Sequence, residues 1–130
     1  VEALRSTDAG VAYLVTADGK TIYHAGDLHW WHWEGEPKAD NGTMAANFKA
    51  FTEPLRGRRI DLAMVPLDGR LKEAEDWGLC CLLDLAELRT VIPMHQWEDY
   101  SPTERFLQKH PEQAGRILPV TQEPQSWEIP

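Results

Sequence analysis

The tight turn centred on Asp18-Gly19 is the feature that most restricts how this chain can fold, because it lies between two runs of β-forming residues. Asp-Gly readily adopts the positive φ angles of a two-residue type I′ turn. Residues 11–16 and 21–24 are therefore predicted to form an antiparallel hairpin. This hairpin would fix the first part of a sheet on which the rest of the chain is expected to build.

An apolar stripe after the hairpin predicts a helix. Its members are Met44, Phe48, Phe51 and Leu55, which recur at spacings of four, three and four. Gly57 is placed to end this helix as a C-terminal cap.

The remaining segments alternate between strand and helix patterns. The predicted strands are residues 1–5, 60–65, 90–92 and 117–120, and the predicted helices are residues 73–88 and 101–110. The last helix is expected to begin with a capping box from Ser101 to Glu104. The tail after about residue 121 is expected to be loosely held. The alternation predicts a layered α/β fold (α+β layered), with a mixed sheet flanked by helices. The length of 130 residues suits one compact domain, or a large piece of one, over residues 1–130.

Composition limits the class of protein. Of the 130 residues, 42% are hydrophobic, which is enough for a packed core, and no apolar run approaches the roughly 20 residues that a membrane span needs. The formal charge of −8 argues against nucleic acid as a partner. The densest basic group, Arg56, Arg58 and Arg59, is interpreted as the solvated end of a helix.

Two adjacent cysteines, Cys80 and Cys81, lie in an apolar run. Neighbouring helical cysteines point in different directions, so buried free thiols are expected rather than a disulfide. Their spacing gives no indication of a redox or zinc role. Free thiols suit a reducing compartment, and a cytoplasmic location is expected.

Two short motifs place a side chain that can bind metal directly after a predicted strand. The first is Ile22-Tyr23-His24-Ala25-Gly26-Asp27, and the second is Val91-Ile92-Pro93-Met94-His95. Gly26 would let the backbone turn tightly, so that Asp27 points across the sheet edge. Carboxylate and imidazole are both good ligands for zinc and similar cations.

The order of these motifs resembles the second half of the metallo-β-lactamase superfamily, and is most similar to the branch related to ascorbate-phosphate lactonases. The resemblance covers roughly the first 105 residues and depends on order and spacing together. It also includes residues 6–11, the run from Gly26 to Trp33, and residues 61–68. It implies half of an αββα sandwich and, in the complete domain, a two-metal site of zinc or manganese.

By this resemblance, Asp27 would bridge the two metals and His95 would bind the second one. Two close cations lower the pKa of a shared water molecule. The resulting hydroxide then attacks the carbon of a carbonyl group or the phosphorus of a phosphoryl group. The implied activity is therefore hydrolysis of a lactone, ester, amide or phosphoester, with Asp27 and His95 as the catalytic residues.

The histidine-rich motif of the family's first half, His-x-His-x-Asp-His, does not occur in the 130 residues. A catalytic zinc normally takes three protein ligands and a water, so two ligands are too few. The chain is therefore expected to be the C-terminal half of such a hydrolase, to bind metal weakly, and to be inactive alone. The other half could have been removed by proteolysis, omitted, or encoded separately.

Other residues around the two motifs are further candidates. The aromatic cluster has two interpretations, a substrate-contacting rim of the pocket or a packed lid. Its members are Trp30, Trp31 and Trp33, with His29 before them and His32 between the last two. His29 and His32 could orient substrate. His24, Asp68 and Arg70 are candidates for residues that contact the metal ligands or the site without binding metal themselves. For Asp68 and Arg70 the alternative is an exposed ion pair in a turn.

The sequence leaves two alternatives to the hydrolase. A non-catalytic association module is one, because a half-sandwich would expose an apolar sheet face that requires a second copy of the chain or a partner that carries the histidine motif. A nuclease is the other, and the charge of −8 argues against it.

Overall fold

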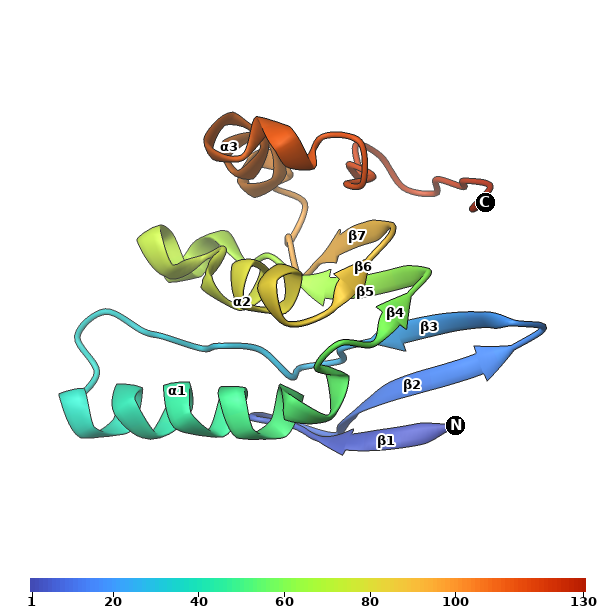
Figure 1. The fold of residues 1–130 in the computed structure, drawn as a ribbon. Helices are drawn as coiled ribbons and strands as arrows, with labels where there is room; N and C mark the ends of the chain where they lie inside the picture. The colour runs from blue at the N-terminus through green and yellow to red at the C-terminus, as the bar shows by residue number, and fades with distance from the viewer.

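The computed structural model describes residues 1–130 and has an α/β architecture, with a mixed five-stranded sheet, a small two-stranded sheet and three helices (Figure 1). The order in the large sheet is β1-β2-β3-β5-β7. Its strands are β1 (Glu2–Arg5), β2 (Val11–Ala17), β3 (Lys20–His24), β5 (Leu62–Pro66) and β7 (Val91–Met94). The small sheet pairs β4 (Arg59–Ile60) with β6 (Glu87–Leu88). The helices are α1 (Lys38–Thr52), α2 (Trp77–Leu85) and α3 (Ser101–Lys109).

The predicted hairpin is confirmed. Strands β2 and β3 pair antiparallel, and the turn residues Asp18 and Gly19 have φ angles of 50° and 77°. Strand β1 adds to β2, also antiparallel. Strands β3, β5 and β7 are parallel to one another, with α1 in the connection from β3 to β5 and α2 in that from β5 to β7.

The prediction of a single strand over residues 60–65 is wrong. The segment is divided between β4 and β5, which belong to different sheets. The break falls at Asp61, whose carboxylate accepts a hydrogen bond from the backbone N–H of Thr21 at 2.9 Å. The backbone N–H of Asp61 also donates to the carbonyl of Thr21 at 2.9 Å, so Asp61 is bonded to β3 at the point where the chain passes from one sheet to the other.

The helix predicted over residues 73–88 is shorter than expected. A 3₁₀ segment, Gly69–Ala74, comes first, and the left-handed Lys72 (φ 56°) interrupts it. Helix α2 then runs from Trp77 to Leu85, and residues 87–88 form β6 instead.

The ends of the other two helices also differ from the prediction. Helix α1 stops at Thr52, and Leu55 lies in a 3₁₀ turn around Pro54, which lacks an N–H for a further helical bond. Gly57 follows in the left-handed conformation with φ 70°.

The capping box at Ser101 does not form. Ser101 is the first residue of α3, its N–H is bonded by the Asp99 carboxylate at 3.1 Å, and its hydroxyl accepts from Arg105. The strand predicted at residues 117–120 is reduced to one bridge between Ile117 and Val91.

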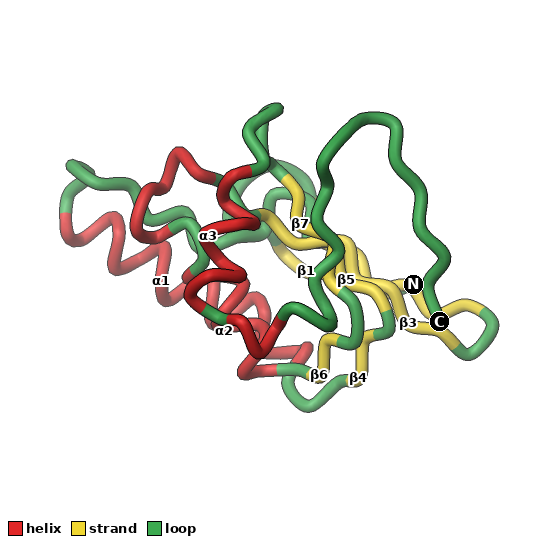
Figure 2. Tube along the Cα trace, turned by 90° about the horizontal axis from the view of Figure 1, so that it is seen from above, coloured by secondary structure: helices red, strands yellow, loops and turns green.

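The core lies between the large sheet and the helices, which are on one side of it (Figure 2). One cross-strand row is completely or almost completely buried, and consists of Leu14, Tyr23, Ala63 and Val91. Phe48 of α1 and two leucines of α2 join these residues in one apolar cluster. None of the helices has both the length and the apolar composition of a membrane span.

The opposite face of the sheet is also largely apolar. The alternate positions on this face carry Val11, Tyr13, Val15, Ile22, Leu62, Met64 and Ile92, which are half-buried or exposed. Val11 and Tyr13 have exposed fractions of 38% and 46%. Strands that are apolar on both faces are typical of sheets covered on both sides.

Gly78 in α2 lies against the buried ring of His29 and gives a first testable prediction. A β-carbon at position 78 would be 2.6 Å from Nδ1 of His29. Gly78→Ala should therefore destabilise the fold by about 1–3 kcal/mol, measured as a lower urea midpoint. Gly42→Ala in α1 is the control, because nothing lies within 4 Å of its added β-carbon. It should stabilise by about 0.5–1 kcal/mol, and equal effects of the two variants would contradict the prediction.

Candidate functional site

Three polar residues follow the carboxyl ends of the three parallel strands. Asp27 comes after β3, Asp68 after β5, and His95 directly after β7. Adjacent parallel strands end at the same edge of a sheet, and ligands of open α/β sheets commonly bind there. The register, which pairs His24 with Met64 and Pro66 with Met94, brings the three segments level with one another.

The side chains of Asp27 and His95 are in direct contact. Nε2 of His95 lies 2.7 Å from Oδ1 of Asp27, although 68 positions separate the two residues. Both side chains are partly accessible, with exposed fractions of 25% for His95 and 33% for Asp27. The indole N–H of Trp31 donates to the backbone carbonyl of Asp27 at 2.8 Å and fixes the turn that presents the carboxylate.

Only glycine fits at position 26 of this turn. Gly26 has φ 55°, and a β-carbon there would be 2.9 Å from the carbonyl oxygen of Val11. The tight turn expected from the sequence therefore forms where β3 passes β2, and it directs Asp27 to the sheet edge.

Asp68 lies behind the imidazole of His95 and is completely buried. Its Oδ2 is 3.7 Å from Nδ1 of His95. Arg70 donates to Asp68 through Nε, through Nη2 at 2.7 Å, and through its backbone N–H. Burial alone would raise the pKa of Asp68, but the hydrogen bonds from Arg70 outweigh it and hold that pKa below its usual range. His95 thus lies between two carboxylates: its Nε2 contacts Asp27 within hydrogen-bond distance, whereas its buried Nδ1 faces Asp68 at 3.7 Å and makes no hydrogen bond.

The loop that carries His95 is conformationally strained. His95, Trp97 and Glu98 have φ angles of 64°, 51° and 66°, in the left-handed region that residues other than glycine rarely adopt. Such strain concentrates at functional sites, where the surroundings hold the backbone in place. Here Trp97 is held by its indole N–H, which donates to Asp68 at 3.3 Å.

A cavity of about 480 Å³ opens over the Asp27–His95 pair. Aromatic and ionisable side chains line it, among them Trp31, Trp33, Trp97, Asp27, Arg70 and His95. The guanidinium of Arg70 lies 5.4 Å from the ring centre of Trp33 and 4.9 Å from that of Trp97, so the two indoles hold it on two sides. The cavity therefore combines apolar walls with one cation beside the carboxylate–imidazole pair.

The other candidate residues lie outside this cavity. His24 is exposed, and its Nδ1 accepts a hydrogen bond from the N–H of Gly26. The ring of His32 packs 4.6 Å from that of Trp77, and Trp30 stacks on Phe48. These contacts correspond to the packed-lid interpretation of this part of the aromatic cluster, whereas Trp33 lines the cavity.

His29 is buried without exposed surface, so it has no access to a substrate in the cavity. Burial lowers its pKa to about 3, which keeps the ring neutral at physiological pH. The hydroxyl of Thr7 donates to the backbone carbonyl of His29 and accepts from its N–H, which fixes the loop to the segment before β2. In this structure the side chain of His29 therefore serves in packing.

The side chains of Asp27 and His95 are suitable ligands for a zinc-type cation, but together they supply only two donors. Asp68 faces the other nitrogen of His95 and is bonded to Arg70, so it does not add a third donor on the same side. A catalytic zinc normally has three protein ligands. The 130 residues therefore bring two donors together at the strand ends, fewer than a catalytic zinc needs.

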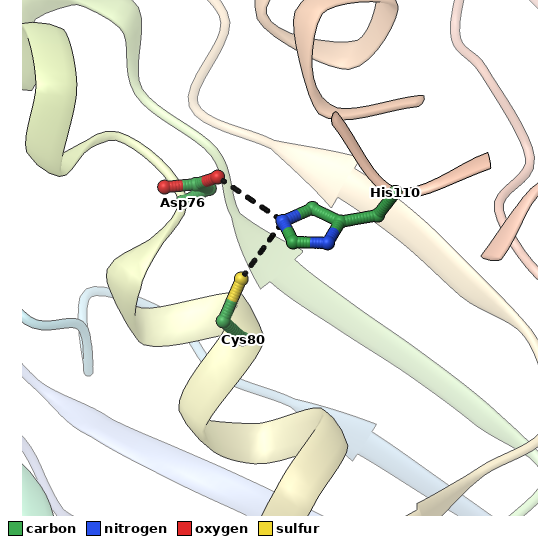
Figure 3. Close-up of side chains that lie close together, drawn as sticks. All are labelled: Asp76, Cys80 and His110. Carbon is green, nitrogen blue, oxygen red and sulfur yellow. Dashed lines mark hydrogen bonds and ion pairs between the residues drawn. The ribbon is translucent and has the colours of Figure 1, made fainter. Parts of the chain in front are cut away.

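A second group of potential ligands was missed by the sequence analysis. Asp76, Cys80 and His110 each offer one donor atom, and these atoms all lie within 4.8 Å of one another (Figure 3). Asp76 is buried, and the other two are half-buried. The four-residue spacing of Asp76 and Cys80 is the only local signal, since His110 comes from another helix, 30 positions after Cys80.

The fold and the strand-end pair define a class: an α/β protein with a carboxylate and an imidazole converging at the carboxyl edge of parallel strands. No family model matches the chain, and comparisons with curated proteins and with solved structures gave no match either. Functional assignment therefore depends on the geometry of the two sites.

Proposed function

We propose that the chain is the C-terminal half of a metal-dependent hydrolase of the metallo-β-lactamase fold, which contributes Asp27 and His95 to a site for two zinc or manganese ions. The observation that carries this proposal is the 2.7 Å contact between the two side chains, which come from two strand ends that β5 separates. Side chains that lay at opposite edges of the sheet would have ruled it out.

The chain's own residues have distinct parts in this proposal. The metal pair, when bound, supplies an activated water for hydrolysis of a lactone, ester, amide or phosphoester. Asp27 and His95 would hold the cations, and the carboxylate of Asp68 faces the other nitrogen of His95 at 3.7 Å, where a small shift would let it accept that N–H and orient the ring. Arg70 presents its free guanidinium edge to the cavity, where it can bind an anionic substrate group. Trp31 and Trp33 exclude water from one wall.

The apolar second face of the large sheet supports the half-sandwich part of the proposal. Figure 2 shows the helices on one side of the sheet only, while the segment after α3 arches beyond the strands and returns toward β3. Val11 and Tyr13 remain exposed on the second face. We propose that the second sheet of the sandwich, with the His-x-His-x-Asp-His ligands, packs there and completes the coordination.

The test begins with the residues encoded on either side of these 130, or in a co-purifying chain. The expected finding is a His-x-His-x-Asp-His motif and, in the complete protein, two metals bound at the strand ends, with hydrolysis of at least one generic lactone, ester or phosphodiester substrate. Metal content at this site that stays unchanged in the Asp27→Asn, His95→Ala double variant would overturn the proposal.

A module that associates without catalysis is the second candidate, and the exposed Val11 and Tyr13 favour it equally. Size-exclusion chromatography with light scattering on the 130 residues separates the two. A symmetric dimer that buries this face against its copy would favour the association module. A nuclease gains no support, because Arg56, Arg58 and Arg59 each pair with a carboxylate.

A further inference from the structure

Asp76, Cys80 and His110 converge from two helices onto one point at the junction of α2 and α3. Asp76 is the N-cap of α2, Cys80 lies one turn later, and His110 is the C-cap of α3. Nε2 of His110 lies 3.6 Å from Sγ of Cys80 and 3.7 Å from Oδ2 of Asp76 (Figure 3). The imidazole nitrogen is thus between the thiol and the carboxylate.

These distances are close to those between the ligands of a tetrahedral zinc ion. Bonds of about 2.0 Å to nitrogen or oxygen and about 2.3 Å to sulfur put neighbouring donors roughly 3.3–3.6 Å apart. The third pair of donors, from Asp76 and Cys80, lies within 4.8 Å, so side-chain shifts of about 1 Å or less would bring the three donors into coordination. The residue types also agree, because thiolate and imidazole together select zinc over magnesium or calcium.

The surroundings of His110 favour the same geometry. Its other nitrogen, Nδ1, lies 3.5 Å from the carboxylate of Glu112. A histidine that binds metal usually donates its second N–H to such an acceptor, which fixes the tautomer and the ring orientation. A cavity of about 160 Å³, lined in part by Cys80, His110 and Glu112, leaves room for a fourth ligand such as water.

From this geometry we propose that Asp76, Cys80 and His110 form a binding site for a single Zn²⁺ that joins helix α2 to the end of helix α3. The site is independent of the one at the strand ends and needs no second chain. The ion would replace the ammonium of Lys109, which pairs with Asp76 at 3.4 Å.

Zinc binding at this site must release a proton. Burial, together with the nearby Asp76 and Asp84, raises the pKa of Cys80 to about 11, so the metal-free side chain is a thiol at neutral pH. The sulfur ligand is a thiolate, and its proton passes to solvent when the Zn–S bond forms.

The first experiment is a titration of the purified chain with Co²⁺, followed by Zn²⁺. We expect a sulfur-to-cobalt charge-transfer band in the near ultraviolet and the visible bands of tetrahedral cobalt, both removed by Zn²⁺. Cys80→Ser should lose the charge-transfer band. Cys81→Ser is the matched control, since it removes the neighbouring half-buried thiol on the same helix and should keep the band. The Asp27→Asn, His95→Ala double variant should keep it too, which separates this site from the proposed hydrolase centre.

A second measurement guards against variants that simply misfold. Zn²⁺ at about 100 times its Kd should raise the Tm of wild type and of Cys81→Ser by roughly 10 °C, and leave that of Cys80→Ser unchanged. Glu112→Gln should weaken Zn²⁺ binding by about 10- to 100-fold, because it removes only the carboxylate that faces the ligand His110. No sulfur band in the folded wild-type chain, or a band that persists in Cys80→Ser, would overturn the proposal.

Discussion

In the complete metal-binding domain proposed above, His95→Ala is expected to weaken metal binding at the strand ends by at least about 100-fold. Mutation of a residue that only hydrogen-bonds to a metal ligand already weakens metal affinity by about 10- to 100-fold, and loss of a ligand itself weakens it more. The affinity is measured by competition with a chromophoric chelator, in a Cys80→Ser background so that the helix-junction site does not contribute.

His32→Gln is the control for this prediction. His32 is also a histidine beside the aromatic cluster, but its ring packs on Trp77 and lies outside the cavity. The metal affinity of the His32→Gln variant should match that of the Cys80→Ser background protein. If His95→Ala bound metal as tightly as His32→Gln, His95 would not be a ligand.

Asp68→Ala is expected to destabilise the fold by about 2–3 kcal/mol at pH 7. The buried carboxylate accepts several hydrogen bonds from Arg70 and one from Trp97, and these donors lose their partner. The figure allows for the half-exposed guanidinium of Arg70, which water can solvate again. Urea unfolding followed by circular dichroism measures the change.

Glu53→Ala is the matched control for burial. Glu53 accepts two hydrogen bonds from Arg56, at 2.6 and 3.1 Å, in the same forked geometry, but on the surface. Its loss should change stability very little, because exposed pairs contribute little. Similar losses in the two variants would show that burial at Asp68 has no influence.

The same carboxylate predicts a dependence of stability on pH. Because the pKa of Asp68 in the folded protein lies below its usual value, its stabilising contribution is complete above the unfolded value of about 3.9. It is lost as the pH falls through the folded value. Wild-type protein should therefore lose stability below about pH 4, and Asp68→Ala should show a shallower decline over urea titrations from pH 7 to 3.

The parts of the fold that the sequence predicts are those with local causes. The Asp18-Gly19 turn sets the hairpin by itself, and the apolar stripe around Phe48 gives α1. The break at Asp61 could not be predicted, because Asp61 is bonded there to Thr21, which lies 40 positions earlier. The end of α2 and the strand β6 likewise depend on pairing with β4.

The two candidate sites differ in the same way. Asp27 and His95 each follow a recognisable strand, and parallel pairing brings strand ends together, so their convergence follows from local motifs and topology. The cluster at the helix junction has no such signal, since Cys80 looks like one more residue of an apolar helix. Only the packing of α3 brings His110 to it.

The sheet order also has a kinetic consequence. Strands β2 and β3 are joined by a two-residue turn and can pair within microseconds, whereas β3, β5 and β7 become neighbours only after long loops close. The cavity over Asp27 and His95 needs all three parallel strands in place, with β5 inserted between the other two. Its assembly should therefore be among the last events of folding, and a chain that has collapsed around the hairpin alone would have no place to receive a metal or a substrate.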